Sequence, residues 1–133
     1  MPDLIWEIDD QDGVFLTFDD GPTPGVTEWI LSTLDKYDAK ATFFVLGKNV
    51  EMYPDLYQRI LDAGHRVGNH TYSHQKGWGM SLERYTEDVD FANDLVHSEL
   101  FRPPYARITP AQARFLGQRY KLVMWLSLIH ISE

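Results

Sequence analysis

The chain has 133 residues, of which 44% are hydrophobic and 14% aromatic, so it can build one sizeable core and is not a disordered chain. Its formal net charge of −8 disfavours a nucleic-acid binder or a polybasic membrane-surface protein, since both need an excess of lysine and arginine. The chain has no cysteine, so histidines and carboxylates would have to hold any metal.

The two ends of the sequence show no membrane segment. Residues 1–7 lack the basic start and apolar stretch of a signal peptide, and the apolar run 122–131 is too short to span a bilayer. As written, the chain is expected to be soluble and cytoplasmic, whereas a natural start upstream of Met1 could carry an export signal. Localisation and oligomeric state are therefore left open by the sequence.

Short apolar runs alternate with amphipathic segments along the chain, which is typical of β/α architecture. Most of these runs are apolar on both faces, as buried parallel strands are. The predicted strands are residues 14–18, 41–46, 65–69, 100–102 and 121–126.

Four amphipathic segments follow the first four strands and predict helices. Thr23 with Pro24 indicates the start of the first helix, Pro54 the start of the second, Ser81 the third and Thr109 the fourth. The buried stripe of the first helix is expected to consist of Val26, Ile30, Leu34 and Tyr37.

Strands that recur every 20 to 35 residues, with a helix between them, favour a parallel sheet or barrel. A complete eight-stranded barrel needs about 250 residues. We therefore predict an α/β fold with about five parallel strands, in which residues 1–133 form a single, incomplete domain. Segment 121–126 is expected to be an exposed edge strand.

Two adjacent carboxylates stand where the first predicted strand ends, in residues 17–22, Thr-Phe-Asp-Asp-Gly-Pro. Active sites of β/α folds lie at that end of the strands. Because adjacent side chains point in different directions, Asp19 and Asp20 can divide roles, one on a metal and the other free. The alternative is a simple turn, since Asp-Gly-Pro is common turn sequence.

Two histidines follow the third predicted strand in residues 70–74, His-Thr-Tyr-Ser-His. With a spacing of four, His70 and His74 would lie on one side of a helical turn and could reach one cation. The alternative is unrelated packing, which is the commoner case for a lone pair. A position directly after a strand, as for the Asp pair, favours a metal site.

Arg102 follows the fourth predicted strand, in residues 101–105, Phe-Arg-Pro-Pro-Tyr. The two prolines make a rigid turn, and the arginine could pair with a buried carboxylate. The alternative is a stiff connector with a solvated arginine. All three segments follow predicted strands, so they are expected to lie on the same face of the fold.

These segments resemble three motifs of the polysaccharide deacetylase family, the NodB-like domains of carbohydrate esterase family four. Residues 17–21 resemble its first motif, 70–74 its second and 102–105 its third, and order and spacing agree from about Val14 to Trp125. The resemblance implies a distorted (β/α) barrel and metal-dependent hydrolysis of an N-acetyl, or sometimes an O-acetyl, group on a sugar.

The resemblance also implies a role for each matching residue. Asp20, His70 and His74 would bind the metal, and Asp19 would be the general base. For the third motif, Arg102 would orient Asp19, and the backbone N–H of Tyr105 would help to hold the oxyanion. The implied metal is most often Zn²⁺, and Co²⁺, Ni²⁺ or Mn²⁺ would also suit such ligands.

The last residues depart from the family pattern. Residues 126–133, Leu-Ser-Leu-Ile-His-Ile-Ser-Glu, replace the expected fourth motif, and His130 lies too close to Trp125 to be the family's general acid. We therefore expect a truncated or misassembled reading frame with impaired turnover. Ala106 also stands where the family often has glycine.

The function predicted from the sequence is removal of acetyl groups, mainly N-acetyl, from carbohydrate. Chitooligosaccharide, the peptidoglycan sugars and acetylated xylan all fit as substrates. The alternative is a non-catalytic carbohydrate-binding or regulatory pseudoenzyme, for which Trp78 and Tyr72 would offer stacking surface. Retention of Asp19 beside the metal ligands favours the enzyme. A metal phosphohydrolase would need more phosphate-binding cations or glycine-rich loops.

Overall fold

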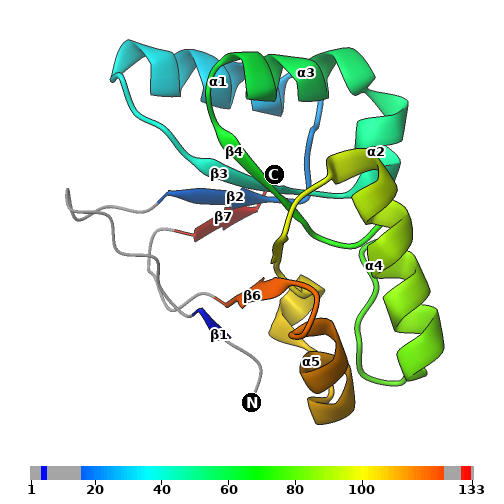
Figure 1. The fold of residues 1–133 in the computed structure, drawn as a ribbon. Helices are drawn as coiled ribbons and strands as arrows, with labels where there is room; N and C mark the ends of the chain where they lie inside the picture. The colour runs from blue at the N-terminus through cyan, green and yellow to red at the C-terminus, as the bar shows by residue number, and fades with distance from the viewer. Residues whose placement is uncertain (1–3, 6–15, 125–129, 133) are drawn as a thin grey trace.

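A parallel β-sheet forms the centre of the structure, a computed structural model that describes residues 4–5, 16–124 and 130–132 (Figure 1). Within these residues the sheet has seven strands in the order β1-β6-β5-β4-β3-β2-β7, and every pairing is parallel. The strands are β1 (Leu4–Ile5), β2 (Thr17–Asp19), β3 (Thr42–Val45), β4 (Arg66–Asn69), β5 (Leu100–Phe101), β6 (Lys121–Val123) and β7 (His130–Ser132).

The α/β class with five predicted parallel strands is confirmed. Strands β2 to β6 correspond to the five predicted segments, and each lies beside its neighbour in the chain, which is the winding of a (β/α) barrel. Residues 14–15 and 125–126 of the predicted strands lie outside the described residues.

The two outermost strands were not predicted from the sequence. β1 and β7 have two and three residues, too few to show a period. Their presence corrects the expectation that segment 121–126 is an edge, because β1 pairs along β6 with Leu4 opposite Leu122.

The helices lie along the outer side of the curved sheet (Figure 1). Four of them follow the predicted segments, whereas α2 was not predicted because it has only six residues. A 3₁₀ turn, η1, spans Pro104–Ala106. The α-helices are α1 (Val26–Lys36), α2 (Gly47–Met52), α3 (Pro54–Asp62), α4 (Leu82–Val96) and α5 (Pro110–Leu116).

The start of α1 differs from the prediction. Gly25, and not Thr23, is the N-cap; its N–H donates to Glu28 Oε1 at 2.7 Å. A φ of +86° at Gly25 breaks the helical run there, which suits glycine. The buried face consists of Thr27, Ile30, Leu31 and Leu34, whereas Val26 and Tyr37 of the predicted stripe are exposed.

The predicted caps of α4 and α5 are confirmed. The Ser81 hydroxyl accepts from the Arg84 N–H at 3.1 Å. Thr109 and Gln112 bond each other's backbone N–H groups in a capping box.

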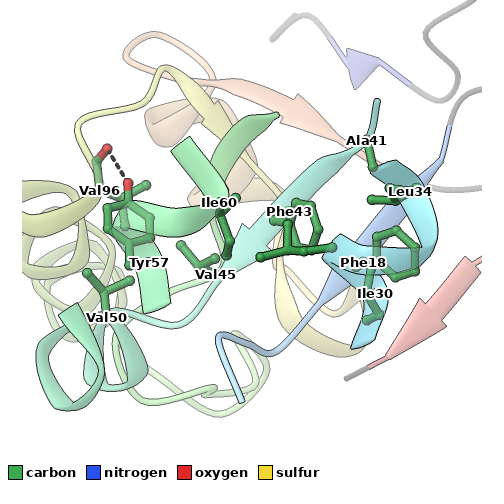
Figure 2. Close-up of a cluster of buried hydrophobic side chains, with 11 residues drawn as sticks. Phe18, Ile30, Leu34, Ala41, Phe43, Val45, Val50, Tyr57, Ile60 and Val96 are labelled. Carbon is green, nitrogen blue, oxygen red and sulfur yellow. Dashed lines mark hydrogen bonds between the residues drawn. The ribbon is translucent and has the colours of Figure 1, made fainter. Parts of the chain in front are cut away.

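The larger hydrophobic cluster fills the space between the sheet and helices α1 and α3 (Figure 2). Phe18 and Phe43 stack with ring centroids 5.2 Å apart. Tyr57 from α3 donates its hydroxyl to the Val96 carbonyl at 3.1 Å, which satisfies the one polar group of this side chain inside the cluster. This packing fixes β2, which carries the first motif, and the neighbouring strand β3.

A second cluster joins α4 and α5 to β5 and β6. It includes Tyr85, Val89, Phe101, Leu116 and Leu122, all of them fully buried. In the described part of the chain, no helix is long and apolar enough to cross a membrane.

His65, just before β4, makes the stability of the fold depend on pH. Its Nδ1 accepts the Ala41 N–H at 3.1 Å in a buried position. Burial lowers the pKa of His65 below 6.5, and the charge of Lys40 lowers it further. The unfolded chain takes up a proton on His65 at higher pH than the folded chain does. The contribution of neutral His65 to stability is therefore complete above about pH 6.5, and it is lost as the pH drops through the lowered pKa of the folded state.

We expect His65→Asn, which keeps an acceptor but does not titrate, to lose less stability between pH 7.5 and 5.5 than the parent chain. Urea unfolding followed by tryptophan fluorescence at both pH values measures this difference. Every other ionisable residue is the same in the two proteins, so the comparison isolates the contribution of His65. Identical pH profiles would contradict the assignment.

Candidate metal centre

The candidate residues of all three motifs stand at the carboxyl ends of the central strands. Asp19 ends β2, His70 directly follows β4 and Arg102 directly follows β5. His70 and Arg102 are held by hydrogen bonds that extend the sheet: the His70 N–H donates to the Val45 carbonyl at 3.0 Å, and the Arg102 N–H to the Asn69 carbonyl at 2.9 Å. Because the strands are parallel, segments far apart in sequence reach one edge of the sheet.

Three side chains converge on one point at this edge. Asp20 Oδ1 lies 3.2 Å from His70 Nε2 and 3.0 Å from His74 Nε2. One ligand atom of each residue lies within 4.8 Å of the others. A carboxylate and two imidazoles are the ligands that zinc accepts, and three protein ligands leave a coordination position open for water or substrate.

The local chemistry of these residues fits a divalent cation. Asp20 Oδ1 is buried and accepts no hydrogen bond in the part of the chain that the structure describes, although it faces both Nε2 atoms. The His70 Nδ1 lies 2.7 Å from the Arg102 carbonyl, which fixes the proton on Nδ1 and leaves the Nε2 lone pair for a metal. Burial lowers the pKa of His74, against the opposing charge of Asp20, which favours the neutral imidazole that a metal ligand needs.

The loop of the two histidines is not a helical turn, which corrects the expected local geometry. Residues 70–74 are irregular, and the backbone is left-handed at Thr71 (φ 68°) and His74 (φ 61°). The Thr71 hydroxyl accepts the His74 N–H at 2.9 Å and closes the loop. The two imidazoles meet through this fold of the loop rather than through helical periodicity.

Asp19 forms a buried ion pair with Arg102. Its Oδ1 accepts from Arg102 Nη1 at 2.9 Å, and its Oδ2 lies 3.8 Å from His70 Nε2. The two adjacent acids therefore occupy different environments, with Asp20 facing both histidines and Asp19 fixed by the arginine.

Arg102 is held from several sides. Besides Asp19, Nη1 donates to the Thr17 hydroxyl at 2.9 Å, and Nε donates to the Val123 carbonyl at 3.2 Å. The guanidinium lies over the Phe44 ring, 4.2 Å from its centroid. The burial lowers the pKa of Arg102, and the Asp19 charge opposes this shift.

Tyr105 borders the metal centre from the side of η1. Its exposed ring lies 4.7 Å from the His74 ring, and the Lys76 ammonium lies 5.2 Å from the Tyr105 ring centroid. The hydrogen bonds of this turn are donated by the N–H groups of Ala106 and Arg107, so the turn does not use the Tyr105 N–H.

Left-handed backbone recurs at this edge of the sheet. Among the candidate residues, φ is positive at Asp20 (78°), His74 (61°) and Tyr105 (61°), and it is also positive at Ala106 (53°). A non-glycine residue in this region is destabilised by about 1–2 kcal/mol, and such positions cluster at functional sites. Ala106 thus keeps the conformation that glycine would adopt without strain.

Several supporting residues were missed by the sequence reasoning. Thr17 had a usable signal, because it lies two residues before Asp19 and shares its face of the strand. Asn49 of α2, which donates to the carbonyls of Asp20 and Pro22, had none, since its helix was not predicted. Asp88 of α4 contacts the histidine loop from 14 residues beyond His74. The side chain of His130 lies outside the described residues.

The sequence matches the family model for polysaccharide deacetylase over residues 7–121. A peptidoglycan-N-acetylglucosamine deacetylase of Bacillus cereus is 38% identical over 125 residues, which cover 84% of this chain and 43% of that protein. The chain thus spans less than half the length of this relative.

Two solved structures show the same fold. A crystal structure of a peptidoglycan N-acetylglucosamine deacetylase matches with a TM-score of 0.86 and 32% identity, over 92% of this chain and 60% of that one. A mutant of a CE4 family pseudoenzyme, with restored enzymatic activity, matches with a TM-score of 0.84 and 27% identity, over 94% and 49%. The chain therefore belongs to the polysaccharide deacetylase family.

Proposed function

We propose that residues 1–133 form part of one catalytic domain that removes acetyl groups, mainly N-acetyl, from carbohydrate by metal-dependent hydrolysis. Peptidoglycan is the first substrate to test, because the relative from Bacillus cereus is a peptidoglycan-N-acetylglucosamine deacetylase, and chitooligosaccharide offers the same N-acetyl group. The observation that carries the proposal is the buried Asp20 Oδ1 facing two imidazoles, beside the Asp19–Arg102 pair.

In this proposal Asp20, His70 and His74 hold the cation, most often zinc, with cobalt, nickel or manganese as other candidates. When bound, the cation would supply Lewis-acid polarisation of the acetyl carbonyl and of a water molecule. The hydrogen bond from His70 Nδ1 to the Arg102 carbonyl keeps the first imidazole oriented and in the required tautomer.

Asp19 acts as the general base. Arg102 fixes its Oδ1 through a hydrogen bond, while its Oδ2 lies on the side of the histidines, where an attacking water would give up a proton. The Tyr105 N–H, which its own turn does not use, is a suitable donor to the acetyl carbonyl oxygen, on which negative charge would develop when water attacks the carbonyl carbon.

We expect the chain to bind zinc and to release acetate from peptidoglycan-derived and chitin-derived oligosaccharides only while metal is present. Acetate is measured before and after treatment with a chelator, and again after zinc is added back. Weak but zinc-dependent release supports the proposal. Release that persists after complete removal of metal would exclude it.

A second candidate is a carbohydrate-binding pseudoenzyme. It is favoured by the likeness to a CE4 family pseudoenzyme and by the exposed rings of Trp78 and Tyr105, since exposed aromatic rings can stack on sugars. Saturable binding of the same oligosaccharides without acetate release, in the zinc-loaded chain, would favour this candidate over the enzyme.

A further inference from the structure

The loop between the two histidines needs external support. Thr71 and His74 both have left-handed backbone, so the loop does not adopt this shape by local preference alone. His74 is also only partly buried, so packing alone does not fix its ring. The groups that hold this loop therefore determine whether both imidazoles point at Asp20.

Asp88, in the middle of α4, contacts this loop with both carboxylate oxygens. Its Oδ2 accepts the backbone N–H groups of Tyr72 and Ser73, each at 3.2 Å. Its Oδ1 accepts the Ser73 hydroxyl at 2.8 Å. Three donors from two consecutive loop residues thus converge on one side chain, and hydrogen bonds to a charged acceptor are stronger than neutral ones.

The same helix holds the loop at a second point. Asn69 donates its Nδ2 to the Val89 carbonyl at 2.8 Å and accepts the Thr71 N–H on its Oδ1, also at 2.8 Å. The Tyr72 ring lies 4.5 Å from that of Phe91. Adjacent residues of α4 therefore fix both the start and the middle of the loop.

Helix α2 supports the loop from another direction. The N–H groups of Gly47 and Lys48 donate to the carbonyls of Thr71 and Tyr72 at 3.0 and 3.1 Å. These bonds use the loop's carbonyls, whereas Asp88 uses its N–H groups. Asp88 is thus the acidic side chain that completes the support of the segment between the two histidines.

We propose that Asp88 is a positioning residue of the metal centre, which sets the affinity for zinc by holding the loop that carries His74. The inference rests on the proposed function, because it takes Asp20, His70 and His74 as the ligands. Asp88 does not touch the cation in this proposal. It acts through the backbone of Tyr72 and Ser73, in the way that hydrogen-bond partners behind metal ligands tune metal sites.

The experiment compares Asp88→Ala with the parent chain and with Asp94→Ala, an exposed acid on the same helix. Zinc affinity is measured by competition with a chromophoric chelator, and amide hydrogen exchange is measured at Tyr72 and Ser73 in the metal-free chains. We expect Asp88→Ala to weaken zinc binding by about 10- to 100-fold and to speed exchange at these two amides. Asp94→Ala should change neither.

Two further variants separate positioning from general stability. Asp88→Asn keeps one acceptor oxygen and should recover part of the zinc affinity, whereas Ser73→Ala removes one of the three bonds and should give a smaller loss than Asp88→Ala. The visible spectrum of the Co²⁺-loaded chains reports the ligand geometry and should change in Asp88→Ala. Folding of every variant is checked by urea unfolding.

An Asp88→Ala chain that folds and binds zinc as tightly as the parent would overturn the inference and leave the proposed function intact. A parent chain that does not bind zinc would instead overturn the proposed function, and with it this inference. Zinc binding by the parent chain therefore distinguishes the two failures.

Discussion

Asp20→Asn is expected to weaken zinc binding by more than about 100-fold, whereas Asp19→Asn should change it by less than about 10-fold. The two acids are adjacent, but only Asp20 places a buried oxygen 3.0–3.2 Å from both Nε2 atoms. Loss of a group that only supports a ligand already weakens metal binding by about 10- to 100-fold, so loss of a charged ligand should exceed that range.

The same two variants should separate binding from chemistry. Asp19→Asn removes the proposed base and should lower zinc-dependent acetate release by about 10²- to 10⁴-fold, while zinc stays bound. Zinc is titrated by calorimetry, and acetate release is measured at saturating zinc. Because Asp19→Asn leaves the buried Arg102 with a neutral partner, urea unfolding must show that the variant is folded at the assay temperature.

His97→Asn is the control for loss of a histidine outside the metal centre. His97 is exposed and caps α4 with left-handed backbone, which asparagine tolerates. It should bind zinc like the parent chain. Equal loss of zinc affinity in Asp19→Asn and Asp20→Asn would contradict the division of roles between the two acids.

The sequence allowed us to predict which residues meet at this edge of the sheet, because each of them is placed by the strand next to it in the chain. The Asp pair, His70 and Arg102 each lie at the carboxyl end of a strand or directly after it, and parallel strands bring their carboxyl ends together whatever their order. The same locality explains the predicted caps at Ser81 and Thr109, where the side chain bonds a backbone group three residues away.

What the sequence did not show depends on contacts between distant segments. Asp88 and Asn49 bond the site loops from helices α4 and α2. The hydrophobic pattern of a helix indicates which face packs on the core, and it does not indicate which loop a polar side chain will contact. The spacing of four between the two histidines indicates a helical turn, whereas the loop has left-handed residues that this spacing does not reveal. The start of α1 at Gly25 is, in contrast, a local feature that depends on one positive φ.

Arg102→Met should destabilise the fold by about 3–5 kcal/mol. The side chains of Arg102 and Asp19 are only 2% and 5% exposed, so loss of the guanidinium leaves a buried carboxylate without its cation. The variant also loses the bonds to Thr17 and Val123, which tie β2 and β6 to the end of β5. Urea unfolding followed by circular dichroism measures the change in the free energy of unfolding.

Arg119→Met is the matched control. Its ion pair with Asp90 is as short, at 2.8 Å against 2.9 Å for Arg102 with Asp19, but these side chains are 45% and 36% exposed. Exposed pairs contribute about 0–1 kcal/mol, because water screens the charges and the long side chains lose entropy when they pair. Similar losses in the two variants would mean that the Arg102 pair behaves as a surface pair and does not fix the position of Asp19.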